Sequence, residues 1–132
     1  MIYNRKGGWR ESSPYRSGLE DKIAEQLERS GIEIQYEAKK IKYVVPASTH
    51  TYTPDWVLPN HIIVESKGLF SVEDRKKHLL IKKQYPNLDI RFVFSSSKTK
   101  IRKGSKTSYA DWCKKYGFKY ADKLIPDAWL RE

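Results

Sequence analysis

The hydrophobic pattern of the chain begins with one helix and continues with strands. Three apolar residues recur at helical spacing: Leu19, Ile23 and Leu27. A capping box, Ser17-Gly18-Leu19-Glu20, precedes this stripe, and Gly31 is typical of a helix end. Residues 32–37 and 41–45 are rich in isoleucine and valine with interleaved charges, which predicts two strands.

The rest of the chain predicts a hairpin over residues 51–67, a helix over 71–85, a strand over 89–94 and a helix over 108–117. Residues 120–132 are expected to form a short packed tail. The expected core stripe of the 71–85 helix consists of Val72, Leu79 and Leu80. The expected anchors of the tail are Leu124, Ile125 and Trp129. This order predicts an α/β fold with a mixed central sheet flanked by helices.

The sequence predicts that the 51–67 hairpin is a pair of central strands. Both strands are apolar on both faces, with the runs Trp56-Val57-Leu58 and Ile62-Ile63-Val64. Residues 46–50 interrupt the strand pattern just before it. Residues 45–50 hold one proline and no glycine, which favours an extended bridge over a tight reversal.

Three ionisable residues lie at the ends of these hairpin strands, namely Asp55, Glu65 and Lys67. A three-residue loop would pair Leu58 with Ile62 and place Asp55 directly opposite Glu65. Lys67 would share the face of Glu65, because side chains two apart on a strand point the same way. Two facing carboxylates repel unless a cation lies between them, and Mg²⁺ prefers oxygen ligands of this kind. An amine beside such a site suits phosphodiester hydrolysis.

Each of these residues also has a structural interpretation. Asp55, Glu65 and Lys67 could form a surface salt-bridge ladder across a hairpin. Glu20 is either the last residue of the capping box or a ligand for metal or water. The three histidines, His50, His61 and His78, lack metal-ligand spacing, and His78 either approaches a phosphate or packs in the interior.

The composition points to a polyanionic partner. The 132 residues form one domain with 39% hydrophobic and 32% charged residues, and the formal net charge is +10. A lysine-rich surface without such a partner is the alternative interpretation. The single cysteine, Cys113, excludes an internal disulfide. No secretory signal or membrane-spanning run is evident, so a cytoplasmic location is expected.

Cationic residues concentrate in three segments: residues 1–16, which are expected to form a flexible basic arm, the 71–85 helix, and a loop over 95–106. These segments are expected to contact phosphates of a nucleic-acid backbone. The candidate DNA-binding residues are Arg16, Ser17, Arg75, Lys76, Lys77, His78, Lys98, Lys100, Arg102 and Lys103.

The motif Pro54-Asp55 followed by Glu65-Ser66-Lys67, with Glu20 upstream, resembles the restriction-endonuclease-like nuclease superfamily. Longer blocks are similar to the phage endonuclease I family of Holliday-junction resolvases. These blocks are Ser17-Gly18-Leu19-Glu20-Asp21, Val45-Pro46-Ala47-Ser48, Thr51-Tyr52-Thr53-Pro54-Asp55, Asp74-Arg75-Lys76-Lys77-His78-Leu79-Leu80-Ile81, Phe94-Ser95-Ser96-Ser97 and Ala121-Asp122-Lys123-Leu124-Ile125-Pro126. The resemblance covers about residues 16–130.

This resemblance implies one or two Mg²⁺ ions, replaceable by Mn²⁺, held by Asp55, Glu65, Glu20 and the backbone carbonyl of Ser66, with Lys67 completing the catalytic site. It also implies an intertwined, domain-swapped homodimer. Residues 17–44 would form the swapped lobe, residues 45–50 the bridge, and residues 51–132 the nuclease core.

The implied activity is structure-selective cleavage of four-way junctions and other branched DNA in two strands. The expected products carry 5′-phosphate and 3′-hydroxyl ends. Two alternatives remain from the sequence: a sequence-specific duplex endonuclease, and a non-catalytic DNA-binding module on a nuclease fold.

Overall fold

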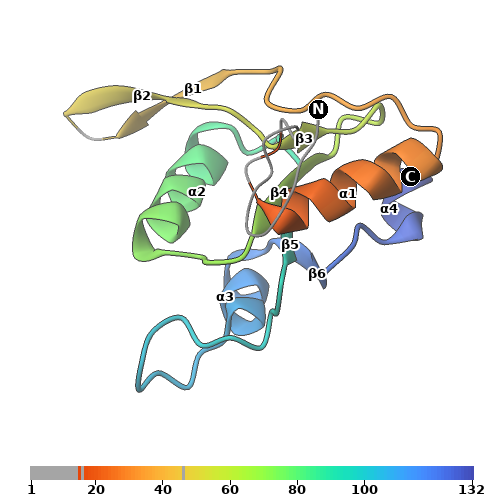
Figure 1. Ribbon diagram of the computed structural model, residues 1–132. Helices are drawn as coiled ribbons and strands as arrows, with labels where there is room; N and C mark the ends of the chain where they lie inside the picture. The colour runs from red at the N-terminus through yellow and green to blue at the C-terminus, as the bar shows by residue number, and fades with distance from the viewer. Residues whose placement is uncertain (1–14, 16, 46) are drawn as a thin grey trace.

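The computed structural model describes residues 15, 17–45 and 47–132. Two sheets are present in this part of the chain: a four-stranded mixed sheet in the order β3-β4-β5-β6 and a two-stranded sheet, β1-β2 (Figure 1). The strands are β1 (Ile41–Val45), β2 (Ser48–Tyr52), β3 (Trp56–Val57), β4 (Ile63–Lys67), β5 (Ile90–Phe94) and β6 (Lys119–Asp122). The helices are α1 (Gly18–Arg29), α2 (Val72–Gln84), α3 (Tyr109–Tyr116) and α4 (Asp127–Leu130). The predicted mixed sheet flanked by helices is confirmed.

The four-stranded sheet separates two apolar clusters, because successive residues on a strand point to opposite faces. On one face, strand residues pack with α2 and α3: Val57, Ile63, Phe92 and Phe94 with Ile81, Tyr109 and Trp112. On the other face, strand residues pack with α1 and the C-terminal tail: Trp56, Val64 and Val93 with Ile23, Leu27, Ile125 and Trp129. Figure 1 shows this layering, with α1 and α4 opposite α2 and α3.

The predicted helix boundaries follow from their caps. Ser17 caps α1 by accepting a hydrogen bond from the Glu20 amide, and the chain leaves α1 through Gly31 at φ 69°. Capping boxes open α2 at Ser71 and α3 at Ser108. None of the helices in the described residues is long and apolar enough to cross a membrane.

The predicted core stripe of α2 is wrong in part, because Val72 is exposed and Leu79 and Leu80 are only half-buried. The buried positions of α2 are His78 and Ile81. The inward face of this helix meets the polar ends of the hairpin strands as well as the apolar core. A purely hydrophobic stripe is therefore absent from α2.

Two segments differ from their predicted structure. Residues 32–37 form one isolated bridge, Tyr36 with Trp56, where a strand was expected. The expected tail instead contains β6, which pairs in parallel with β5. Ile125 and Trp129 are buried as predicted, whereas Leu124 is 46% exposed and does not anchor the tail.

The chain reverses between β1 and β2, where an extended bridge was expected. Val45 pairs with Ser48 and Ile41 with Tyr52 in an antiparallel register, so residues 45–50 do not run straight in the single chain. Ala47 takes φ 79° in this turn, which supplies the left-handed conformation that glycine usually provides. The β1–β2 hairpin projects from the body of the protein (Figure 1). The side chain of Gln84 on α2 forms hydrogen bonds with the backbone of Val44 in this hairpin.

Candidate active site

The register of the β3–β4 hairpin brings Asp55 opposite Glu65. Trp56 pairs with Val64, and the loop of residues 59–61 closes the hairpin as predicted. One step beyond this register, the backbone amide of Asp55 donates to Oε2 of Glu65 at 3.0 Å. The two acids therefore meet at the ends of buried strands, so the salt-bridge ladder on an exposed surface is excluded. The prediction of two central strands is wrong for β3, which lies at the edge of the sheet, whereas β4 is internal.

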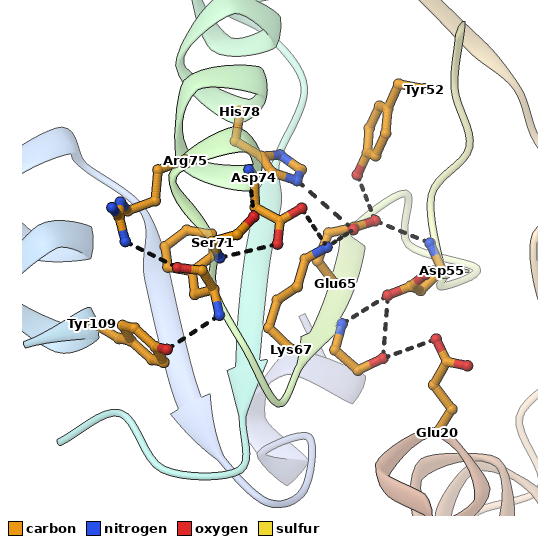
Figure 2. A network of polar contacts seen from close by, with 12 residues as sticks. Glu20, Tyr52, Asp55, Glu65, Lys67, Ser71, Asp74, Arg75, His78 and Tyr109 are labelled. Atoms are coloured by element: carbon orange, nitrogen blue, oxygen red, sulfur yellow. Dashed lines mark hydrogen bonds and ion pairs between the residues drawn. The ribbon is translucent and has the colours of Figure 1, made fainter. Parts of the chain in front are cut away.

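Glu65 is 2% exposed, and its carboxylate is held from several sides (Figure 2). The Tyr52 hydroxyl donates to Oε2 at 2.6 Å, in addition to the Asp55 amide. Lys67 Nζ lies 3.7 Å and His78 Nε2 lies 3.8 Å from Oε1. Burial raises the pKa of Glu65, and the charge of Lys67 and the Tyr52 hydrogen bond oppose that rise.

Asp55 lies in a crowded anionic environment. Its Oδ2 accepts hydrogen bonds from the Ser66 amide at 2.9 Å and the Ser66 hydroxyl at 3.2 Å. Burial, followed by the charges of Glu65 and Glu20, raises the pKa of Asp55 to about 8. A cation beside Asp55 would offset this repulsion.

Glu20 reaches the hairpin from α1, and its carboxylate contacts residues of two other segments. Its Oε1 accepts a hydrogen bond from the Tyr36 hydroxyl at 2.6 Å, and its Oε2 lies 3.5 Å from the Ser66 hydroxyl. The side chain is 4% exposed. The backbone of Glu20 thus takes part in the cap of α1, while its carboxylate joins the cluster around Asp55.

Glu37 also joins this cluster, although sequence reasoning missed it. One carboxylate oxygen from each of Glu20, Glu37 and Asp55 lies within 4.8 Å of the other two. The Glu37 amide donates to the Asp55 carbonyl at 3.1 Å, which places the residue beside the hairpin. The sequence placed Glu37 at the end of the predicted 32–37 strand, but no local signal showed that this segment packs against the hairpin.

Lys67 supplies the positive charge of the site. It forms ion pairs with Glu65 at 3.7 Å and with Asp74, in the first turn of α2, at 3.5 Å. Burial alone would lower the pKa of the Lys67 ammonium, but the charges of Glu65, Asp74 and Asp55 raise it above its ordinary value. Lys67 is therefore a cation at neutral pH.

The chemistry of these donors fits a hard divalent cation. Carboxylate oxygens from three segments of the chain converge on one another, those of Glu20 and Asp55 buried and that of Glu37 half-buried, and no sulfur or imidazole ligand is among them in the described cluster. An oxygen-only set beside an ammonium group can bind a metal ion and a phosphate together.

The family assignment follows from comparison with known proteins. The profile of the phage endonuclease I family matches residues 1–132. This chain belongs to the phage endonuclease I family. It is 61% identical to endonuclease I of Escherichia phage T7 over 125 residues, which cover 95% of this chain and 84% of the relative. It is 59% identical to endodeoxyribonuclease 1 of Enterobacteria phage T3 over 118 residues, covering 89% and 78%. This membership supports a nuclease function.

Most candidate DNA-binding residues lie on the surface. Exposed candidates are Ser17, Lys76, Lys98, Lys100, Arg102 and Lys103. Lys77 is half-buried, with its Nζ 5.7 Å from the centre of the Tyr52 ring. Arg16 and nearly all of the predicted 1–16 arm lie outside the described residues. The loop over 95–106 projects from the body near α3 (Figure 1).

Two of the candidate DNA-binding residues differ from expectation. His78 is fully buried, so the prediction that it contacts DNA is wrong. Its burial, together with the charges of Lys67 and Lys77, lowers its pKa well below the ordinary value. Arg75 donates from Nη1 to the carbonyls of Phe70 and Ile101 at 2.9 and 3.2 Å. Arg75 thus connects α2 to the 95–106 loop through its hydrogen bond to Ile101, so its guanidinium is used within the fold.

Proposed function

We propose that this chain is a structure-selective endodeoxyribonuclease that resolves four-way junctions and other branched DNA in a metal-dependent reaction. The observation that carries the proposal is the convergence of Glu20, Asp55, Glu65 and Lys67 in one network of polar contacts. Family membership with endonucleases supports it. Because the matching relatives come from phages, the host cytoplasm is the proposed location.

In this proposal, Asp55, Glu65, Glu20 and the carbonyl of Ser66 would hold one or two Mg²⁺ or Mn²⁺ ions. Glu37 is added as a further candidate ligand, because its carboxylate lies within 4.8 Å of those of Glu20 and Asp55. The bound cation supplies Lewis-acid polarisation of the phosphate and lowers the pKa of water.

The chain's own residues position the reactants and offset charge. Lys67, held between Glu65 and Asp74, stabilises the negative charge that develops on the phosphate. The water oxygen bonds to phosphorus, the bond to the 3′-oxygen breaks, and that oxygen leaves with a proton. The products then carry 5′-phosphate and 3′-hydroxyl ends.

The DNA is proposed to lie across the cationic surfaces of α2 and the 95–106 loop. A cavity of about 310 Å³ beside the N-terminus of α1 is lined in part by Lys22 and Lys123, which extends this positive surface toward Glu20. Contacts of this kind grip the backbone and carry little base information, which favours recognition by shape.

Two symmetric cuts require two sites, and we propose a homodimer to supply them. In the single chain, α1 packs beside its own hairpin. Opening the turn between Val45 and Ser48 would let residues 17–44 make the same contacts with the hairpin of a partner. Residues 45–50 would then be the bridge of a domain-swapped dimer, and residues 51–132 its nuclease core.

The test is incubation of the protein with Mg²⁺ and either a four-way junction or a linear duplex of the same sequence. Symmetric cleavage of the junction, with an intact duplex, is the expected result. Cutting of the duplex at one sequence would instead identify a sequence-specific endonuclease. Binding of both DNAs without cleavage in Mg²⁺ or Mn²⁺ would identify a non-catalytic binding module.

The affinity for junction DNA is expected to fall steeply with salt. If about six phosphates are contacted, log affinity should decrease with log salt concentration with a slope of about −5, because each contact releases condensed counterions. Electrophoretic mobility shifts without Mg²⁺, over a series of KCl concentrations, measure this slope. A flat response would exclude phosphate contacts as the main source of binding.

Replacing Lys98 and Lys103 together by glutamine tests whether the 95–106 loop contributes to this salt dependence. Both side chains are exposed on the cationic loop. If each contacts one phosphate, the slope should become shallower by about 2 units. An unchanged slope in this variant would place the loop away from the DNA.

A further inference from the structure

His78 is a polar residue in an unusual position. It is 0% exposed, and neither of its ring nitrogens has a hydrogen-bond partner in the described part of the chain. Buried polar groups in proteins are almost always hydrogen-bonded, because desolvation without a partner costs free energy. An aliphatic side chain would fill the same space without that cost. The position therefore calls for a role that an apolar residue cannot fill.

The ring of His78 is held in a fixed orientation by its neighbours. The rings of Tyr52 and Phe92 meet it edge-to-face, with centroids 5.3 and 4.9 Å away. In this orientation Nε2 lies 3.8 Å from Oε1 of Glu65, and Figure 2 shows the ring pointing at that carboxylate. His78 is thus aimed at a residue of the candidate active site.

The two oxygens of Glu65 are not equivalent. Oε2 accepts two hydrogen bonds, from the Tyr52 hydroxyl at 2.6 Å and the Asp55 amide at 3.0 Å. Lys67 Nζ at 3.7 Å and His78 Nε2 at 3.8 Å face Oε1, and both are beyond hydrogen-bond length. A shift of less than about 1 Å would bring His78 Nε2 within hydrogen-bond distance of Oε1.

We propose that His78 is a positioning residue that donates a hydrogen bond from Nε2 to Oε1 of Glu65 when the site holds its divalent cation. This inference rests on the proposed metal-dependent function. The hydrogen bond would complete the set of donors around Glu65 and fix the orientation of its carboxylate as a ligand. Groups that orient metal ligands in this way commonly change metal affinity by about 10- to 100-fold.

The first experiment follows the imidazole directly in the wild-type chain. Nitrogen-15 NMR of histidine side chains is recorded while Mg²⁺ is added to the protein without DNA. We expect the Nε2-bound proton of His78 to shift downfield as the hydrogen bond forms. His50 is exposed on β2 and His61 is exposed in the hairpin loop, so their signals serve as internal references. A His78 signal that stays constant through a titration in which Mg²⁺ demonstrably binds would overturn the proposal.

The second experiment separates positioning from packing. His78→Leu fills the space of the imidazole ring but has no hydrogen-bond donor. His78→Gln retains an amide N–H that can extend about as far toward Glu65. Calorimetric Mg²⁺ affinity is expected to fall about tenfold in His78→Leu and to recover in His78→Gln. Metal-free junction binding should be the same in both. Equal Mg²⁺ affinity in the two variants would overturn the proposal.

The outcomes also distinguish this inference from the proposed function on which it rests. A wild-type protein that neither binds Mg²⁺ nor cuts a junction overturns both. A wild-type protein that binds Mg²⁺ and cuts junctions, with an unresponsive His78 and an unaffected His78→Leu variant, overturns the role of His78 alone. If His78→Leu fails to fold, the NMR titration of the wild-type protein still decides.

Discussion

Replacing Glu65 by glutamine is expected to abolish metal-dependent cleavage while junction binding is retained. Glutamine preserves the shape of the side chain and an oxygen that can accept the Tyr52 and Asp55 hydrogen bonds. It removes the negative charge that would hold a cation beside Lys67. Loss of metal-derived stabilisation of several kcal/mol corresponds to a cleavage rate lower by about a thousandfold or more.

The experiment compares single-turnover cleavage and metal-free binding of the same junction. Glu73→Gln is the matched control, since Glu73 is an exposed carboxylate on α2 that carries the same change of charge. The control should cleave at the wild-type rate. Removing an acid from an anionic site does not weaken phosphate attraction, so Glu65→Gln should bind the junction at least as tightly as the wild type. A Glu65→Gln chain with wild-type turnover would exclude Glu65 as a metal ligand.

The hairpin and its register could be predicted because local rules determine them. Alternation of faces along a strand and a three-residue turn are enough to place Asp55 opposite Glu65, and the structure has that register. Helix starts at Ser71 and Ser108 were predictable for the same reason, since a capping residue acts within one turn.

The contribution of Glu37 could not be predicted, because it depends on contacts between distant segments. The 32–37 segment makes only one bridge with β3, so strand propensity alone overstated its structure. Glu37 is brought to Asp55 by contacts of its segment with the hairpin, among them the hydrogen bonds from the Glu37 amide to the Asp55 carbonyl and from the Val57 amide to the Gln35 carbonyl. A tertiary contact of this kind leaves no periodic trace in the sequence.

The face of α2 was misassigned for a related reason. Hydrophobic periodicity assumes that the buried side of a helix is apolar. The inward positions of α2 instead include Asp74, which pairs with Lys67, and His78, which faces Glu65. Asp74, His78 and Ile81 follow helical spacing of four and three residues, but two of the three are polar. A helix that supports an active site breaks the pattern that would reveal its orientation.

Whether the active site is shared between two chains can be tested by complementation. Glu20 lies on α1 and Glu65 on β4, on opposite sides of the proposed bridge at residues 45–50. Glu20→Ala and Glu65→Ala chains are each expected to be inactive. Unfolding them together and refolding should restore nicking of four-way junctions if α1 is exchanged. Each mixed dimer would then carry one site with both substitutions and one site with neither.

The expected recovery follows from random pairing. About half of the dimers in an equal mixture are mixed, and each has one intact site of two, so about a quarter of wild-type sites should return. Those sites would nick one strand rather than cut both. Mixing Asp55→Ala with Glu65→Ala is the matched control, because both residues lie on the same hairpin and exchange cannot separate them. That mixture should stay inactive whether or not α1 is exchanged between the chains.

The contacts of Glu20 within one chain mean that either dimer arrangement could form the site, so the test has two distinct outcomes. Glu20 and Ser66 already meet within one chain, so the fold can assemble the site without a partner. If the dimer keeps that arrangement, every site in a mixed dimer retains one substitution and no nicking returns. Recovery in the Glu20 and Glu65 mixture, with none in the Asp55 and Glu65 mixture, therefore requires α1 from one chain to complete the hairpin of the other. Absence of recovery after verified dimer formation would contradict the exchange and leave each chain with its own site.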